Sequence, residues 1–97
     1  MSAMKMVMII IDEAKRDELE VFLDRVGVIG YTELSHAAGM GTTGPRLGSR
    51  AFPRTSAVVF SVIGAEDLER LRLGIDQFCA QCGEDLKMIA WDVDEVR

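Results

Sequence analysis

Residues 4–11 read MKMVMIII, a near-continuous apolar run in which half of the residues are β-branched. Such a run predicts a buried β-strand. Residues 55–63, TSAVVFSVI, form a second run of the same kind. Because successive side chains of a strand point to opposite faces, both strands are apolar on both faces. The two runs therefore predict a sheet that needs cover on each side.

The segments around these two runs alternate between helical and strand patterns. Asp12 has the residue type of a helix N-cap, and Gly27 closes the helix that follows it. The apolar face of this helix comprises Leu19, Phe22, Leu23 and Val26. A second helix starts near Ala65 and ends at Gly83, with Leu68, Leu71, Ile75, Phe78 and Cys82 on one face. Residues 28–35 and 86–93 are the remaining predicted strands.

The resulting order, β-α-β-β-α-β, predicts an α+β fold of the ferredoxin-like type. Residues 1–97 then form a single domain, in which a four-stranded antiparallel sheet carries two helices on one face. The helices leave the other sheet face uncovered, so we expect an oligomer. Residues 36–54 contain four glycines and both prolines of the chain, which predicts a long loop.

The charges are unevenly distributed along the 97 residues. The net charge of −5 argues against general nucleic-acid binding. No acidic residue lies between Glu33 and Glu66, and this interval contains Arg46, Arg50 and Arg54. One basic loop on an acidic body favours an anion or an acidic partner surface. Two cysteines, no secretory signal and no run of membrane-spanning length favour a cytoplasmic protein without membrane insertion.

Residues 39–44, GMGTTG, match the G-x-G-x-x-G pattern of a phosphate-binding turn. A dinucleotide-binding turn is disfavoured because no helical periodicity follows Gly44. A P-loop is disfavoured because Pro45 and Arg46 stand where lysine and serine or threonine are required. The remaining hypothesis is a functional loop in which glycine N–H groups and arginine side chains bind an anion.

Cys79 and Cys82 form a C-x-x-C motif, but they lie in the last turn of a predicted helix. Reactive cysteines of this spacing normally lie at a helix N-terminus, where the dipole stabilises the thiolate. Both cysteines fall on or near the core face, where cysteine packs as a small apolar residue. The residue types and spacings predict no catalytic acid–base pair and no catalytic triad, so we predict no catalytic residue and no enzyme.

The chain resembles the P-II nitrogen-regulatory signalling family over nearly all of residues 4–96. The resemblance rests on the segments KMVMIII (5–11), RDELEVFL (16–23), GVIGYTEL (27–34), GMG (39–41) and AWDVDEV (90–96). It implies a cytoplasmic homotrimer that binds an adenine nucleotide (ATP, ADP or AMP) between subunits. It also implies a T-loop, here the arm of residues 36–54, that regulates a partner protein in nitrogen metabolism.

The resemblance, together with the loop composition, assigns candidate binding residues. The ligand-binding candidates are Thr32, Gly39, Gly41, Thr42, Thr43, Arg46 and Lys87, and the partner-binding candidates are Arg50 and Arg54. The chain departs from the family pattern in two places. Its T-loop is shortened, and residues 83–87, GEDLK, lack the second glycine of the family's phosphate-binding loop.

Two other classes of protein remain open. One is a trimeric metal-binding protein like the divalent-cation-tolerance family, with Cys79, Cys82 and His36 as ligands. The other is a small ferredoxin-like enzyme, which would need polar groups in a pocket between sheet and helices. The predicted strands offer few such groups, chiefly Thr32, Ser35 and Ser61.

Overall fold

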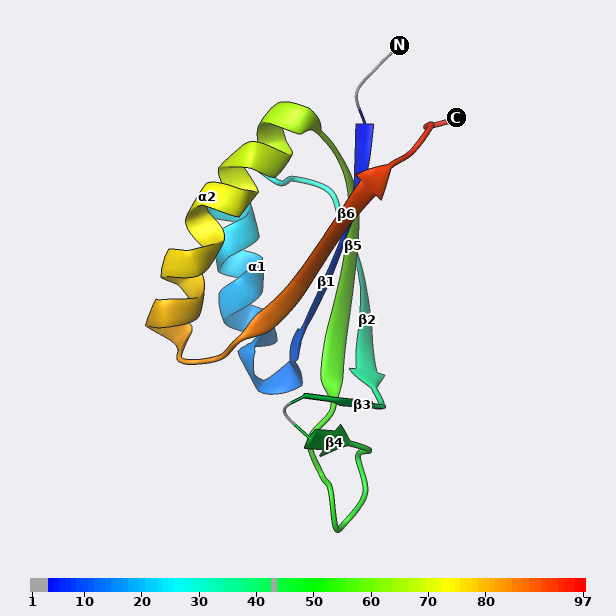
Figure 1. Ribbon diagram of the computed structural model, residues 1–97, viewed down its shortest axis with the longest axis vertical. Coiled ribbons are helices and arrows are strands. Elements are labelled where there is room, and N and C mark those ends of the chain that lie inside the picture. The colour runs from blue at the N-terminus through cyan, green and yellow to red at the C-terminus, as the bar shows by residue number, and fades with distance from the viewer. Residues whose placement is uncertain (1–3, 43) are drawn as a thin grey trace.

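The computed structural model describes residues 4–42 and 44–97. The elements in chain order are β1 (Met4–Asp12), the 3₁₀ turn η1 (Glu13–Lys15), α1 (Arg16–Arg25), β2 (Thr32–Ala37), β3 (Gly39–Gly41), β4 (Gly44–Arg46), β5 (Ser56–Gly64), α2 (Ala65–Cys82) and β6 (Leu86–Asp92). Four strands form one antiparallel sheet in the order β2-β5-β1-β6. Both helices lie on the same face of this sheet (Figure 1). The predicted α+β, ferredoxin-like architecture is confirmed.

The hydrophobic core lies between the sheet and the helices. Every second residue at the centre of β1 faces the helices, and the same alternation holds in β5. The buried apolar residues are Val7, Ile9, Ile11, Leu19, Phe22, Leu23, Val28, Ala57, Val59, Ile63, Leu71 and Phe78. Burial of these side chains is the main favourable contribution to folding.

The opposite face of the sheet is also apolar, and neither helix covers it (Figure 1). On this face Met8 is paired with Phe60, and Ile10 is paired with Val58. Their side chains are half-buried. Trp91 on β6 is paired with Met6 and is exposed. The prediction that β1 and β5 are apolar on both faces is confirmed.

The helix ends follow the local chemistry read from the sequence. One carboxylate oxygen of Asp12 accepts a hydrogen bond from the Ala14 backbone N–H at 2.9 Å, which caps η1 ahead of α1. Gly27 follows α1 with a φ of 90°, and Gly83 ends α2 with a φ of 72°. Both conformations are left-handed and favour glycine. The predicted C-terminal ends of both helices are therefore confirmed, whereas Asp12 caps the 3₁₀ turn and not α1 itself, which begins after Lys15.

The second strand and the long loop differ from the prediction. Residues 28–35 were expected to form a strand, but β2 pairs with β5 only from Thr32, opposite Phe60. The Val28 N–H instead donates to Leu23 O at the end of α1, and Ile29 is 94% exposed. High β-propensity in residues 28–31 is thus overridden by the helix end. The expected loop also contains a short hairpin, formed by β3 and β4.

The arm of residues 36–54 projects beyond one end of the sheet, opposite the start of β1 and the end of β6 (Figure 1). Hydrogen bonds within the arm stabilise it beyond the hairpin: Gly48 N–H donates to Arg54 O at 3.2 Å, and Ser49 N–H donates to Phe52 O at 3.0 Å. At its base, Glu13 N–H donates to Thr55 O at 3.0 Å. The arm is therefore tied to the body where it leaves and rejoins the sheet.

Candidate functional site

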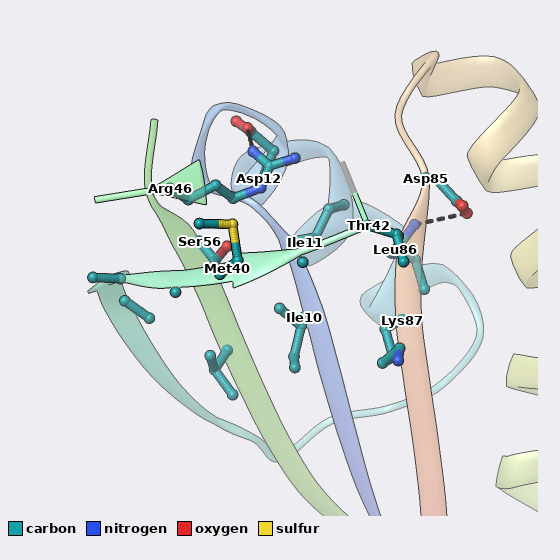
Figure 2. Close-up of a pocket in the computed structure, with 15 residues that line it drawn as sticks. Ile10, Ile11, Asp12, Met40, Thr42, Arg46, Ser56, Asp85, Leu86 and Lys87 are labelled. Carbon is teal, nitrogen blue, oxygen red and sulfur yellow. Dashed lines mark hydrogen bonds and ion pairs between the residues drawn. The ribbon is translucent and has the colours of Figure 1, made fainter. Parts of the chain in front are cut away.

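A cavity of about 480 Å³ lies between the hairpin and the adjacent end of the sheet. Figure 2 shows the hairpin crossing over the sheet strands, with Met40 and Thr42 above the cavity and Ile10 below it. Asp12, at the end of β1, and Lys87, near the start of β6, contribute charged groups to the lining. The site is thus assembled from the first strand, the last strand and the arm.

The cavity brings together most of the residues that the sequence nominated for ligand binding. Those that line it are Gly39, Gly41, Thr42, Arg46 and Lys87. Lys87 is paired with Ile10 across the ladder, which places it on the sheet face away from the helices. Thr43 lies outside the described residues. The nominated segments, far apart in sequence, therefore meet at one place in the fold.

Thr32 does not belong to this cavity. It lines a second hollow of about 240 Å³, together with Tyr31, Phe60 and Ser61. Thr32 is paired with Phe60, so its side chain lies on the same uncovered sheet face as Lys87. The nominated ligand residues are therefore divided between two places on one face.

The two arginines nominated for partner binding differ in their surroundings. Arg50 is exposed on the arm. Arg54 contacts two carboxylates of the body, with its Nη2 atom 2.6 Å from Asp12 Oδ2 and 3.1 Å from Glu84 Oε1. From the sequence alone, Asp12 is interpreted only as a helix cap, and Glu84 is included only as part of residues 83–87. The one signal available was the excess of arginine in a loop that has no acidic residue of its own.

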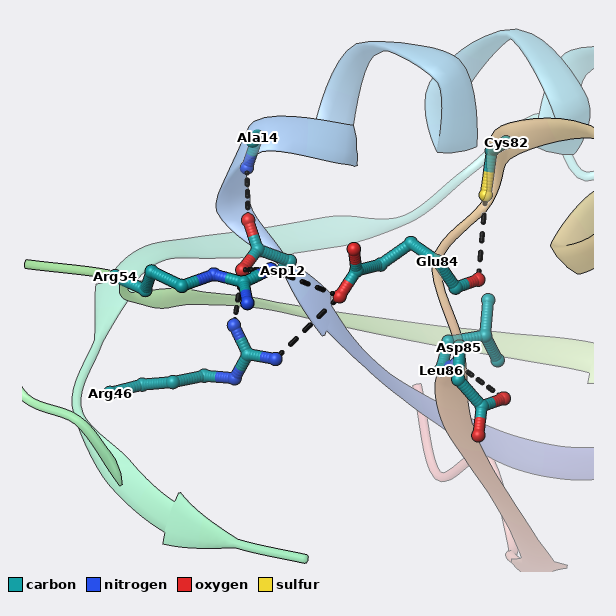
Figure 3. Close-up of polar contacts among 8 residues, drawn as sticks. All are labelled: Asp12, Ala14, Arg46, Arg54, Cys82, Glu84, Asp85 and Leu86. Carbon is teal, nitrogen blue, oxygen red and sulfur yellow. Dashed lines mark hydrogen bonds and ion pairs between the residues drawn. The ribbon is translucent and has the colours of Figure 1, made fainter. Parts of the chain in front are cut away.

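Arg46 converges on the same two carboxylates (Figure 3). Its Nη1 donates a hydrogen bond to Asp12 Oδ2, and its Nη2 lies 3.6 Å from Glu84 Oε1. Burial alone would raise the pKa of Asp12, whose side chain is only 5% exposed. The Ala14 hydrogen bond and the charges of Arg54 and Arg46 outweigh burial, so the pKa of Asp12 is lowered. The carboxylate is therefore ionised at neutral pH.

A second group of charges lies beside α1. Arg16 Nε is 3.4 Å from Glu33 Oε1, and this largely buried oxygen accepts no hydrogen bond from the described residues. Burial raises the pKa of Glu33, and neighbouring Glu20 raises it further. The Arg16 charge opposes this shift without cancelling it. The surroundings of Glu33 therefore raise the pKa of its carboxyl group above the ordinary value.

The structure does not gather the residues of the metal-binding alternative. Cys79 and Cys82 pack against the core at the end of α2, and burial raises the pKa of the Cys79 thiol. The backbone N–H of His36 donates a hydrogen bond to Glu13 Oε1. In residues 4–42 and 44–97, no three His, Cys, Asp or Glu side chains are placed to hold a metal ion. Over the same residues, no helix combines the length and apolar character needed to cross a membrane.

The enzyme alternative needs a polar pocket between the sheet and the helices. The side chains that fill this space in the described part of the chain are those of the apolar core. Ser61 is buried, and its hydroxyl donates a hydrogen bond to Gly30 O. Both hollows described above instead include residues of the uncovered sheet face.

Comparison with known proteins places this fold in a family. A family model described as "Nitrogen regulatory protein P-II" matches residues 4–96. No curated protein matches the chain. The solved structure of CPII from Thiomonas intermedia K12, a nitrogen regulatory PII-like protein bound to ADP, AMP and bicarbonate, is similar at a TM-score of 0.71 and 22% identity. That alignment covers 95% of this chain and 89% of CPII.

A PII-like signalling protein from Thermus thermophilus is similar at a TM-score of 0.68 and 16% identity, covering 95% of this chain and 88% of that one. A further CPII structure, bound to ADP and bicarbonate, has a TM-score of 0.71 and 23% identity, with 95% and 89% covered. At these sequence identities, the similarity to solved structures shows only that the fold is shared. The family model, in contrast, matches almost the whole sequence. The chain belongs to the P-II family of nitrogen regulatory proteins.

Proposed function

We propose that the protein is a P-II-like regulator that binds an adenine nucleotide, such as ADP, AMP or ATP, in the cavity beneath the hairpin. The observation that carries this proposal is the convergence of Arg46, Lys87 and the glycine backbone of 39–41 on one cavity. Guanidinium, ammonium and backbone N–H groups are the usual partners of phosphate. The ADP, AMP and bicarbonate present in CPII structures support the same class of ligand.

The size and lining of the cavity suit such a ligand. Its volume of about 480 Å³ falls in the range typical of small-molecule sites. Ile10, Val58 and Met40 supply apolar surface, and Asp12, Arg46, Asp85 and Lys87 supply the charged groups of the lining. An adenine ring needs apolar cover and its phosphates need cationic groups, and the cavity offers both. Bicarbonate, a smaller anion, needs only the polar part of the lining.

The uncovered sheet face supports a trimer in which this face lies at the subunit boundary. Met8, Ile10, Phe60 and Trp91 present apolar surface that a monomer would leave in water. The cavity borders this face, so a neighbouring subunit would complete the binding cleft. Light scattering should therefore give a mass about three times the 10.7 kDa of one chain. A monomer at micromolar concentration would contradict this assembly.

The arm is the proposed contact with a regulated partner protein. Its tip exposes Leu47 and Phe52 beside Arg50, a combination of apolar and cationic groups that is common at protein interfaces. Because the base of the arm borders the cavity, a bound ligand would change the surroundings of the arm. We infer that the protein signals ligand occupancy to this partner, in keeping with nitrogen regulation by its family.

Calorimetric titration with ADP, AMP and ATP, with and without bicarbonate and magnesium, tests the nucleotide site. We expect binding to the wild type, and binding about tenfold weaker in Arg46→Gln and Lys87→Gln, because each substitution removes a charged phosphate partner. Arg72→Gln is the matched control, since Arg72 is exposed on α2 and pairs with Glu69. Absence of binding in the wild type, or equal affinities in all four proteins, would overturn the assignment.

A further inference from the structure

Two arginines of the arm meet two carboxylates of the body beside the cavity. Arg46 comes from β4 and Arg54 from the end of the arm, whereas Asp12 ends β1 and Glu84 lies between α2 and β6. Figure 3 shows the two guanidinium groups beside the carboxylates of Asp12 and Glu84. Each arginine contacts each carboxylate. We call these four residues the latch.

The latch is built from side chains that are mostly shielded from water. Asp12 is 5% exposed, Arg46 is 13% exposed and Glu84 is 21% exposed, while Arg54 is 54% exposed. A shielded charge is stable only while its partner is present. Asp12 Oδ1 accepts from Ala14, so the second oxygen of the same carboxylate serves both arginines. The pairing therefore ties the position of the arm to the ends of β1 and α2.

The latch and the cavity share residues. Asp12 and Arg46 line the cavity, and Glu84 immediately precedes Asp85, which lines it as well. The two positive and two negative charges of the latch cancel. An anion that approaches Arg46 therefore meets a cation that already has carboxylate partners. To pair with Arg46, the anion must compete with Asp12 and Glu84.

We propose that the latch couples the cavity to the arm: with the cavity empty, Asp12 and Glu84 hold the arm through Arg46 and Arg54. An anionic ligand exchanges for these carboxylates at Arg46 and thereby loosens the arm. This inference rests on the proposed function, since it assumes an anionic ligand in the cavity. Its first half, the restraint of the arm by the two carboxylates, is testable without any ligand.

Glu84→Gln is the main test variant, because it removes one carboxylate charge while keeping the shape of the side chain. The readout is hydrogen exchange of the Gly48 amide, which donates to Arg54 O. We expect exchange about fivefold faster than in the wild type, the size of effect of one partly exposed ion pair. The Ile9 amide, in a central strand, serves as the internal reference for global opening. Glu69→Gln, which removes an exposed glutamate–arginine pair elsewhere on α2, should leave Gly48 exchange unchanged.

Asp12→Asn should accelerate Gly48 exchange further, because Asp12 is the more buried carboxylate and asparagine can still accept from Ala14. This variant risks a general loss of stability, which would also accelerate the Ile9 reference. Glu84→Gln keeps the test decisive in that case. Unchanged Gly48 exchange in Glu84→Gln, in a protein with wild-type circular dichroism, would overturn the latch.

Titration with ADP tests the second half of the proposal, in which an anionic ligand displaces the carboxylates from Arg46. Glu84→Gln removes a competitor for Arg46, so we expect its Kd for ADP to fall about three- to fivefold below that of the wild type. ADP added to the wild type should accelerate Gly48 exchange. Lack of ADP binding by the wild type would overturn the proposed function and the exchange step, whereas faster Gly48 exchange in Glu84→Gln would still support the restraint. ADP binding with an unchanged or higher Kd in Glu84→Gln would refute the competition.

Discussion

Replacing Asp12 with asparagine measures how much the buried carboxylate contributes to stability. Asparagine keeps the volume of the side chain and an acceptor for the Ala14 N–H, but it loses the charge that serves Arg46 and Arg54. Hydrogen bonds to a charged group contribute about 1.5–3 kcal/mol. Arg54 recovers part of its loss from water because it is half exposed, and Arg46 retains Glu84 at 3.6 Å. We therefore expect a loss of about 2 kcal/mol, which lowers Tm by about 8–16 °C.

Urea unfolding followed by circular dichroism at pH 7 measures this loss. All proteins are compared at one subunit concentration, because the stability of an oligomer depends on concentration. Asp92→Asn is the matched control, since Asp92 also forms an ion pair, with Lys5, but is 84% exposed. We expect the control to lose less than about 0.5 kcal/mol. A loss in Asp12→Asn as small as that of the control would refute the energetic role of the buried carboxylate.

The pH dependence of the difference in unfolding free energy between the wild type and Asp12→Asn provides an independent check. The pKa of Asp12 in the folded protein is lowered from its ordinary value of 3.8. A lowered pKa means that the unfolded chain binds the proton more tightly, so the stabilisation is fully present above pH 3.8. It is lost as the pH falls through the lowered pKa. The gap between wild type and Asp12→Asn should therefore be constant from pH 7 to about pH 5 and shrink below about pH 4.

Three further substitutions test other features of the fold. Glu33→Gln should stabilise the protein by about 1 kcal/mol at pH 7. Burial raises the pKa of Glu33 above 4.5, so the stability that the protonated carboxyl gives at low pH is lost as the pH rises through the pKa of the folded protein. If Glu33→Gln stabilised the protein as much at pH 4 as at pH 7, this reasoning would be contradicted. Gly83→Ala should lower the free energy of unfolding in urea by about 1–2 kcal/mol. An added Cβ at this position meets no atom within 4 Å, so the loss would come from backbone strain at the left-handed φ alone. An unchanged urea midpoint would rule this out. In the Cys82→Ala variant at pH 8, iodoacetamide should modify Cys79 more slowly in the native protein than in the urea-unfolded protein. The reason is that burial first, and the charge of Asp85 second, raise the pKa of the Cys79 thiol. Equal rates would show that Cys79 is an accessible thiolate.

Local chemistry accounts for the features that the sequence alone could predict. The apolar runs at β1 and β5 have the length and the β-branched content that are typical of buried strands. Gly27 and Gly83 end the two helices because both positions require a left-handed backbone. Asp12 caps η1 through a hydrogen bond only two residues away. Each of these signals depends on neighbours within one or two turns of the chain.

The features that were missed depend on contacts between distant segments. The start of β2 is set by pairing with β5, and residues 28–31 have the composition of a strand but lack a partner strand. The hairpin strands are short and rich in glycine, so they carry no alternating pattern. The contacts of Arg46 with Asp12 and Glu84 join residues 34 and 38 positions apart in the sequence, and no local sequence pattern predicts them.

The strand order has a consequence for synthesis on the ribosome. β1 lies between β5 and β6, so both of its partners are made after it: Ile11 is paired with Ala57, and Met6 with Trp91. At about 5–20 residues per second, about 2 to 9 s separate the translation of Asp12 from that of Ser56. During this interval the most apolar strand has both of its edges unpaired. We therefore expect aggregation of nascent chains to depend chiefly on residues 4–11, and slower translation of the arm codons to aggravate it.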